Sequence, residues 1–269
     1  MTFTDLQFIF NRALALTFSK KKLALVFLVV ALCGLMVVFF RGLAANAGEW
    51  ILMSLTFLPF FLCAGVLLAL GILLIRVYHD EVKGKAVDYK GIINKSWEVM
   101  IGSSYLSVPI ILSYLLLWIL LGMFILLIKT PVVGDFFGVV LAFGPFLLNL
   151  GSIVLALLSL AMLFLLTPIV ALKGLNRIRV TQMLVDRIKA DPFSNIVLAF
   201  FALLPLLFVS GLLLLAAYMT GSVCQSCDSP LHNTLQWFFV MIPFTALLTP
   251  AVVFFFNFAA EAHVLIRSK

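Results

Sequence analysis

The amino-acid sequence predicts an all-α integral membrane protein whose six transmembrane helices form three hairpins, each preceded by an amphipathic helix. Of the 269 residues, 64% are hydrophobic and 11% are charged, and the mean hydropathy is +1.24. A soluble domain needs more polar surface than this composition supplies. Several uncharged runs also reach the roughly 20 residues that a helix needs to cross a ~30 Å hydrocarbon layer. The alternating strands typical of outer-membrane barrels are not evident in the sequence.

Six spans are predicted, at about residues 23–40, 50–75, 106–128, 143–172, 196–219 and 235–260. The fourth is the least sharply bounded, because the uncharged stretch 136–172 would make a helix of ~55 Å. Gly144-Pro145 is a natural break in it, so residues 136–143 are expected to lie along the outer interface or dip into it. The long polar segment ahead of the first span argues against a cleavable signal peptide, and the first span is expected to act as an uncleaved signal anchor.

Lys and Arg are distributed very unequally between the two sides of these spans. The N-terminus holds four, the loops 76–95 and 173–189 five each and the C-terminus two, whereas only Arg41 and Lys129 lie on the opposite side. This bias predicts a protein of the cell (inner) membrane with both termini in the cytoplasm. Membrane lipids are the expected partners, with anionic headgroups contacted by Lys20, Lys21, Lys22, Arg177 and Arg179. Nucleic-acid binding has no support, and a homo-oligomer or a membrane-protein partner is left open.

The segments ahead of the first, third and fifth spans share one layout. A polar–basic pair precedes an apolar run at the same distance in each: Asn11-Arg12 before Leu23, Asn94-Lys95 before Leu106, and Asp186-Arg187 before Leu198. Each segment has apolar residues at helical spacing with charge on the other face, which predicts helices lying flat on the cytoplasmic interface. The chain is therefore interpreted as one membrane domain, 1–269, built from repeats 1–80, 81–175 and 176–269.

Prolines recur in the second, fourth and sixth spans, and their positions are interpreted as helix kinks that could shape a cavity. The alternative is chance, together with the usual abundance of proline in membrane helices. The residues are Pro59, Pro145, Pro168, Pro243 and Pro250.

The six spans with amphipathic lead-ins, together with the segment "LTPIVALKGLNRIRVTQMLVDRIK" at 166–189, resemble bacterial six-helix inner-membrane families. These families are related to the membrane domain that accompanies some glycerophosphodiester phosphodiesterases. The resemblance implies an envelope protein of this type. It does not imply phosphodiesterase activity, because no such catalytic domain is attached here.

The predicted spans contain no Asp, Glu, Arg, Lys or His, which disfavours an ion-coupled pump. Glu261 and His263 are expected at the inner end of the last span, where water can reach them. Asn149 and Asn257 form the candidate intramembrane polar site; each either hydrogen-bonds a neighbouring helix or coordinates a substrate between repeats. No catalytic residue, cofactor or metal site is predicted.

The four cysteines divide into two pairs. Cys33 and Cys63 fall inside spans and are interpreted as small buried residues. Cys224 and Cys227 fall in an outer loop, where a disulfide is the favoured interpretation because disulfides persist outside the cytoplasm. Free thiols, a zinc site that includes His232, and a redox-active pair are the alternatives.

These observations favour a non-enzymatic inner-membrane protein in envelope or lipid homeostasis, either a scaffold or a small facilitator. The first alternative is a transporter whose path lies between the repeats. The second is a membrane thiol-disulfide protein that uses Cys224 and Cys227.

Overall fold

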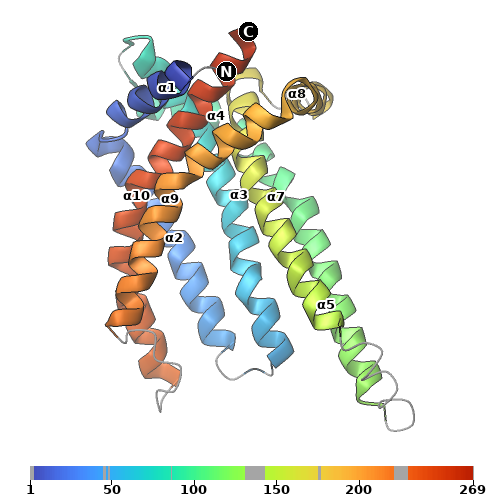
Figure 1. Cartoon of the computed structure of the whole chain (residues 1–269). Coiled ribbons are helices and arrows are strands. Elements are labelled where there is room, and N and C mark those ends of the chain that lie inside the picture. Colours follow the sequence, from blue (N-terminus) through green and yellow to red (C-terminus); the bar gives the residue numbers. More distant parts are fainter. Residues whose placement is uncertain are drawn as a thin grey trace.

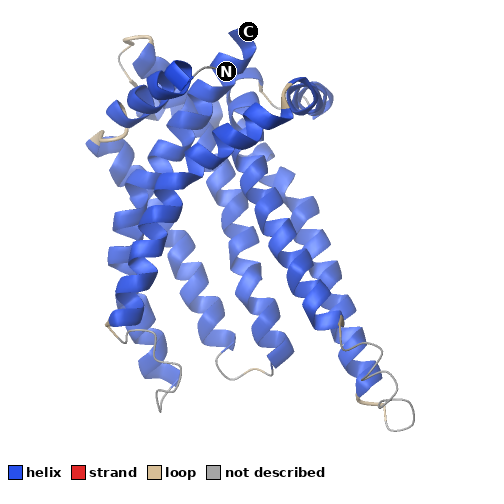
Figure 2. Ribbon diagram, viewed as in Figure 1, coloured by secondary structure: helices blue, strands red, loops and turns tan. Residues whose placement is uncertain are grey.

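The computed structural model describes residues 3–44, 47, 49–85, 87–130, 143–174, 177–220 and 230–268, and over these it contains helices and no strand (Figure 2). The elements in chain order are α1 (Phe3–Ala15), α2 (Lys20–Ala44), α3 (Glu49–Val82), α4 (Tyr89–Ser104), the short 3₁₀ helix η1 (Tyr105–Ser107), α5 (Val108–Ile128), α7 (Gly144–Lys173), α8 (Arg177–Ala190), α9 (Pro192–Met219) and α10 (Pro230–Ser268).

Six helical stretches in the described chain are long and apolar enough to cross a membrane, which confirms the predicted all-α membrane fold class. They are α2, α3, the continuous run of α4, η1 and α5, α7, α9 and α10. Several helices extend beyond the predicted apolar limits: α10 covers 230–268 where the sequence predicts a span at 235–260. Hydropathy marks where the apolar run ends, but charged residues are compatible with further helical turns.

The helices converge at one end of the bundle and diverge toward the other (Figure 1). Both chain termini lie at the convergent end with α1, α4 and α8, and we call it the termini end; the opposite end is the far end. Neighbouring helices pack in the order α5, α7, α3, α2, α10, α9. The consecutive pairs α2–α3, α5–α7 and α9–α10 each pack side by side within this order.

The main hydrophobic core lies toward the termini end, where helices from all parts of the chain meet. Its most deeply buried large side chains come chiefly from α3, α7 and α10 and include Phe164, Phe254, Phe256 and Phe258. Large apolar side chains nearer the far end of α5 and α9, such as Leu126 and Leu214, are instead exposed. Because the helices diverge there, these side chains have few protein neighbours and are suited to contact with lipid.

Gly71 of α3 faces side chains of both other central helices, α7 and α10. A Cβ at this position of α3 would collide with the ring of Phe256 on α10 and would lie 2.7 Å from Cγ2 of Thr167 on α7. Only a residue without a side chain leaves room for both of these side chains at this position.

The proline positions differ in structural role. Pro59, Pro168, Pro243 and Pro250 lie inside α3, α7 and α10. Pro145 lies in the first turn of α7, because the helix begins at Gly144. Its interpretation as a kink is therefore wrong, since a proline in the first turn removes an N–H that has no intrahelical partner. Residues 136–142, predicted to lie along the outer interface, fall outside the described residues.

Candidate functional site

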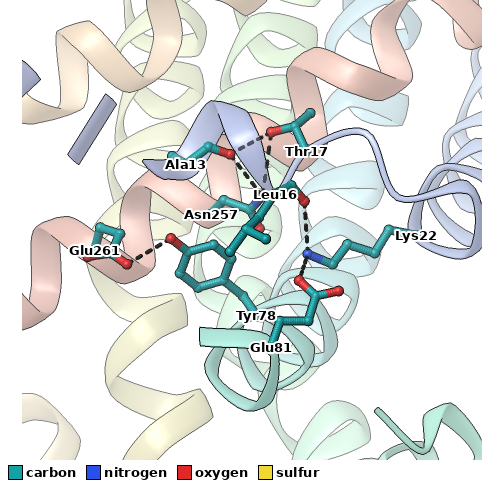
Figure 3. A network of polar contacts seen from close by, with 8 residues as sticks. All are labelled: Ala13, Leu16, Thr17, Lys22, Tyr78, Glu81, Asn257 and Glu261. Carbon is teal, nitrogen blue, oxygen red and sulfur yellow. Dashed lines mark hydrogen bonds and ion pairs between the residues drawn. The ribbon is translucent and has the colours of Figure 1, made fainter. Parts of the chain in front are cut away.

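A network of polar side chains occupies the termini end of the bundle, between α1, α2, α3 and α10 (Figure 3). At its centre Lys22, in the first turn of α2, is 0% exposed. Its Nζ forms an ion pair with Oε2 of Glu81 on α3 and donates a hydrogen bond to the carbonyl of Leu16 (3.1 Å). A buried ammonium is tolerated only when its charge and its N–H groups are satisfied, and Glu81 and Leu16 supply these partners.

A second ion pair lies beside the first and involves Glu261 of α10. The Tyr78 hydroxyl donates to Oε1 of Glu261 (2.7 Å), and Nε of Arg12 on α1 lies 3.4 Å from the same oxygen. The Tyr78 ring also lies 5.5 Å from Nζ of Lys22, within cation–π range. Tyr78 therefore links the two ion pairs, and the network joins α1, α2, α3 and α10.

Asn257 fastens the end of α1 to α10. Its Nδ2 donates to the carbonyl of Ala13 (3.3 Å) and lies 3.5 Å from Oγ1 of Thr17, which itself donates to the Ala13 carbonyl (2.8 Å). Asn257 is fully buried, and its Oδ1 has no hydrogen-bond partner among the described residues. The geometry agrees with Asn257 as a helix-to-helix hydrogen-bonding residue, one of its two predicted roles.

A cavity of about 170 Å³ opens next to this network. One part of its wall is polar and contains both cationic and anionic groups, and the other part is aliphatic. The lining residues are Arg12, Tyr78, His79, Lys83 and Glu261 on the polar side, and Ile75, Val82, Leu172, Ala260 and Val264 on the apolar side.

Two further arginines hold the other short helices against the bundle. Arg76 of α3 donates to the Ala171 carbonyl of α7 (3.0 Å, from Nε) and to Oγ of Ser96 on α4 (2.7 Å, from Nη1). Contacts from a single guanidinium thus fix α4 relative to both spanning helices. The planar fork of N–H donors suits arginine to this bridging role better than lysine.

Arg187 of α8 is 7% exposed and bridges three helices. Its Nε donates to Oδ1 of Asn195 on α9 (3.2 Å), and its Nη1 donates to the Leu165 carbonyl of α7 (3.3 Å) and to Nδ1 of His263 on α10 (3.2 Å). Its Nη2 is buried without a partner in the described chain. Burial disfavours the charged form and lowers the pKa of Arg187 to about 10, so the side chain stays protonated at neutral pH.

The two asparagines of the predicted intramembrane site are not brought together. Asn149 lies in the second turn of α7 and lines a cavity of about 20 Å³ with Tyr114 and Trp118, which has room for one water. Asn257 lies in the second half of α10, beyond both prolines of that helix. At 1.5 Å per residue the two side chains differ in height by roughly 30 Å, so they occupy opposite halves of the bundle.

Two predictions about charged residues need correction. Lys22 cannot contact lipid headgroups, because its ammonium is enclosed and paired with Glu81. Glu261, expected to be accessible to water, is 8% exposed, because Tyr78 and Arg12 pack over it. Lys20 and Lys21 are exposed as their predicted role requires, and the side chains of Arg177 and Arg179 lie outside the described residues.

The cysteines give two different outcomes. Cys33 and Cys63 are free and buried, as predicted, and the Cys63 thiol donates to the Cys33 carbonyl (3.7 Å). Cys224 and Cys227 lie outside the described residues, as does the side chain of His232, so their disulfide stays a prediction. Within the part of the chain that the structure covers, no cluster of three or more His, Cys, Asp or Glu side chains could hold a metal ion.

Tyr78, His79, Glu81 and Lys83 are not predicted as site residues from the sequence. Their contacts join distant segments: Tyr78 and Glu261 are 183 residues apart in the chain. One signal was available, because "RVYHDEVK" at 76–83 places an aromatic hydroxyl and both signs of charge at the end of a long apolar run.

Comparison of the chain with protein families, with curated proteins and with solved structures finds no match. The resemblance to the membrane domain of glycerophosphodiester phosphodiesterases therefore stays a prediction.

Proposed function

We propose that this chain is a non-enzymatic protein of the inner membrane that acts in lipid homeostasis as a scaffold at the cytoplasmic leaflet. The observation that carries the proposal is the construction of the termini end. There α1, α4 and α8 are held against the spanning helices through the polar contacts of Arg12 and Asn257, Arg76, and Arg187. The charge bias of the loops favours the cytoplasm for this end.

In this proposal α1, α4 and α8 are interfacial helices of three related repeats, with exposed apolar side chains directed at the lipid. Phe8 of α1, Trp97 of α4 and Ile178 of α8 are all more than half exposed in the isolated chain. An aromatic or aliphatic side chain exposed at the end of a membrane bundle is suited to the headgroup–acyl boundary. Exposed Lys20 and Lys21 at the start of α2 would add attraction to anionic lipid.

A scaffold accounts for the geometry better than a transporter does. A path between the repeats requires polar groups aligned through the membrane, whereas Asn149 and Asn257 lie in opposite halves of the bundle. The cavity beside Asn149 holds about one water, and the cavity of about 170 Å³ that Arg12 and Glu261 line is located at the termini end.

The proposal is tested by lipid analysis of cells that lack the protein. We expect an altered phospholipid composition that the wild-type gene restores and that a variant with a disrupted termini end, such as Glu81→Gln, does not. Reconstitution into liposomes that contain a fluorescent phospholipid distinguishes a small facilitator from a scaffold. With a scaffold, the phospholipid should cross the bilayer no faster than it does in protein-free vesicles. An unchanged lipid composition, or uptake of a water-soluble solute by the liposomes, would contradict the proposal.

A further inference from the structure

The cavity at the termini end has a composition that selects a particular ligand chemistry. It lies between α1, α3, α7 and α10, at the last turns of α3 and α7. Its polar wall combines guanidinium, imidazole, ammonium and phenol groups with one carboxylate, and its other wall is aliphatic. The polar and apolar halves of the wall match the polar and apolar parts of an amphiphilic ligand.

The one carboxylate of the cavity is already engaged within the protein. Glu261 accepts from the Tyr78 hydroxyl and pairs with Nε of Arg12. Arg12 has no other acceptor among the described residues, so its terminal N–H groups are available for a ligand. Its side chain is 38% exposed, which gives an incoming anion access.

Two more nitrogen-bearing side chains line the same cavity from the end of α3. Lys83 is exposed, forms no ion pair within the described chain and directly follows the last residue of α3, and His79 lies in the last turn of that helix. Asp80 is adjacent in sequence but is not among the lining residues. With His79 neutral, Arg12 and Lys83 outweigh Glu261, so the cavity carries net positive charge.

Size and surroundings limit the ligand further. At about 170 Å³ the cavity has room for several water molecules, so a phosphate group with a small esterified alcohol can enter it. Val264, on the apolar side, is 52% exposed, and Leu172 beside it is also open to the outer surface of the bundle. An acyl chain attached to the bound group can therefore leave the cavity along these side chains.

We propose that this cavity binds the phosphate ester of a membrane phospholipid, with Arg12, His79 and Lys83 contacting the phosphate and Leu172 and Val264 contacting the start of an acyl chain. Arginine and lysine are the side chains that bind phosphate oxygens most strongly through charge-assisted hydrogen bonds. The inference deepens the proposed function, because it names the lipid chemistry on which the scaffold would act. It concerns binding by the purified protein, so it can succeed or fail independently of any change in cellular lipid composition.

Native mass spectrometry of the purified full-length protein in mild detergent tests this site. The probes are phosphatidylglycerol, diacylglycerol with the same acyl chains, and glycerol 3-phosphate. We expect the wild type to retain phosphatidylglycerol and not diacylglycerol. Lys83→Gln, which removes the charge, and His79→Leu, which removes the ring N–H, should each weaken the retention about tenfold, as expected for the loss of a hydrogen bond to a charged phosphate. Lys85→Gln is the matched control, because Lys85 is an exposed cation two residues from Lys83 that does not line the cavity.

A second variant tests the apolar half. Val264→Trp should fill the acyl exit and weaken phosphatidylglycerol retention while leaving the thermal stability unchanged, because position 264 is half-exposed. Displacement of the lipid by millimolar glycerol 3-phosphate would support the phosphate site but assign it to a water-soluble ester. Equal retention of diacylglycerol, an equal effect of Lys85→Gln, or full retention in both Lys83→Gln and Val264→Trp would overturn the proposal.

Discussion

The fully buried ammonium of Lys22 makes Glu81 important for the stability of the fold. Glu81→Gln preserves the shape of the side chain but removes the charge that offsets the desolvation of Lys22. Removing one partner of a buried ion pair costs about 3–5 kcal/mol, and we expect a value near the lower limit because Glu81 is itself 17% exposed. The measurement is the thermal unfolding midpoint of the purified protein in detergent, which should fall by several degrees.

The double variant Lys22→Met with Glu81→Leu separates the charge effect from packing. Replacing both partners leaves no unpaired buried charge, so most of the lost stability should return. Glu98→Gln, at an exposed position of α4, is the control for removing a carboxylate near the same end of the bundle. A double variant no more stable than Glu81→Gln alone would show that the ion pair is not the cause.

Arg187 provides a second prediction at the scale of a residue. Its guanidinium donates at once to acceptors on α7, α9 and α10, a geometry that a lysine ammonium cannot reproduce. We expect Arg187→Lys to lower the unfolding midpoint although the charge is kept. Lys189→Arg, two residues later on the exposed face of α8, should leave the midpoint unchanged within about 1 °C. Equal midpoints for Arg187→Lys and the wild type would contradict the bridging role.

At the scale of the element, the close packing of α3, α7 and α10 depends on Gly71. Gly71→Ala places a methyl group against Phe256 and Thr167 in a fully packed region. Overpacking of this kind costs about 1–3 kcal/mol, more than the gain in helix propensity from glycine to alanine. The unfolding midpoint in detergent should therefore fall.

Gly211→Ala is the matched control for this prediction. Gly211 also lies inside a spanning helix, α9, but nothing lies within 4 Å of a Cβ built there. The same gain in helix propensity applies, so the difference between the two alanine variants reports packing alone. If both variants were equally stable, the three helices would not approach one another as closely as the structure shows.

The elements themselves were largely predictable from the sequence, but their contacts were not. Long uncharged runs determined all six spans, and helical spacing of apolar residues determined α1, α4 and α8, because both signals are local. The limits of α10 were missed because its last turns carry Glu261 and His263, which hydropathy counts as loop. Burial of Lys22 was missed because its partner Glu81 lies in the last turn of the next helix, 59 residues later in the chain, and a lysine beside a span normally extends toward the headgroups.

The helices α1, α4 and α8, which precede the first, third and fifth spans, are the three lead-in helices. Corresponding positions in them have different surroundings, which sequence spacing alone does not reveal. Arg12 pairs with Glu261, Arg187 is buried among three helices, and Lys95 is exposed with its carbonyl accepting from Arg76. Each lead-in helix is nevertheless held by a basic side chain. If the chain did arise from three repeats, the means of attachment diverged while the position of the helices was kept.

At the scale of the whole molecule, the orientation across the membrane is the property on which the functional proposals depend. Cys224 and Cys227 are predicted outside and the termini end inside. Cys33 and Cys63 are buried and should not react with a polar maleimide. In intact cells, a membrane-impermeant maleimide should label Cys224 and Cys227 after reduction. Absence of labelling before reduction, with labelling afterwards, would identify the disulfide.

A cysteine at the termini end completes this test. Lys85→Cys, in a protein that also carries Cys224→Ser and Cys227→Ser, places one exposed thiol in the turn after α3. We expect it to react only after the membrane is permeabilised. Reaction in intact cells would show that the protein has the opposite orientation. In that orientation 16 cationic side chains lie outside the cytoplasm, against the usual bias. The proposed phosphate-ester site would then face the outer leaflet, so the orientation decides which leaflet the proposed scaffold would serve.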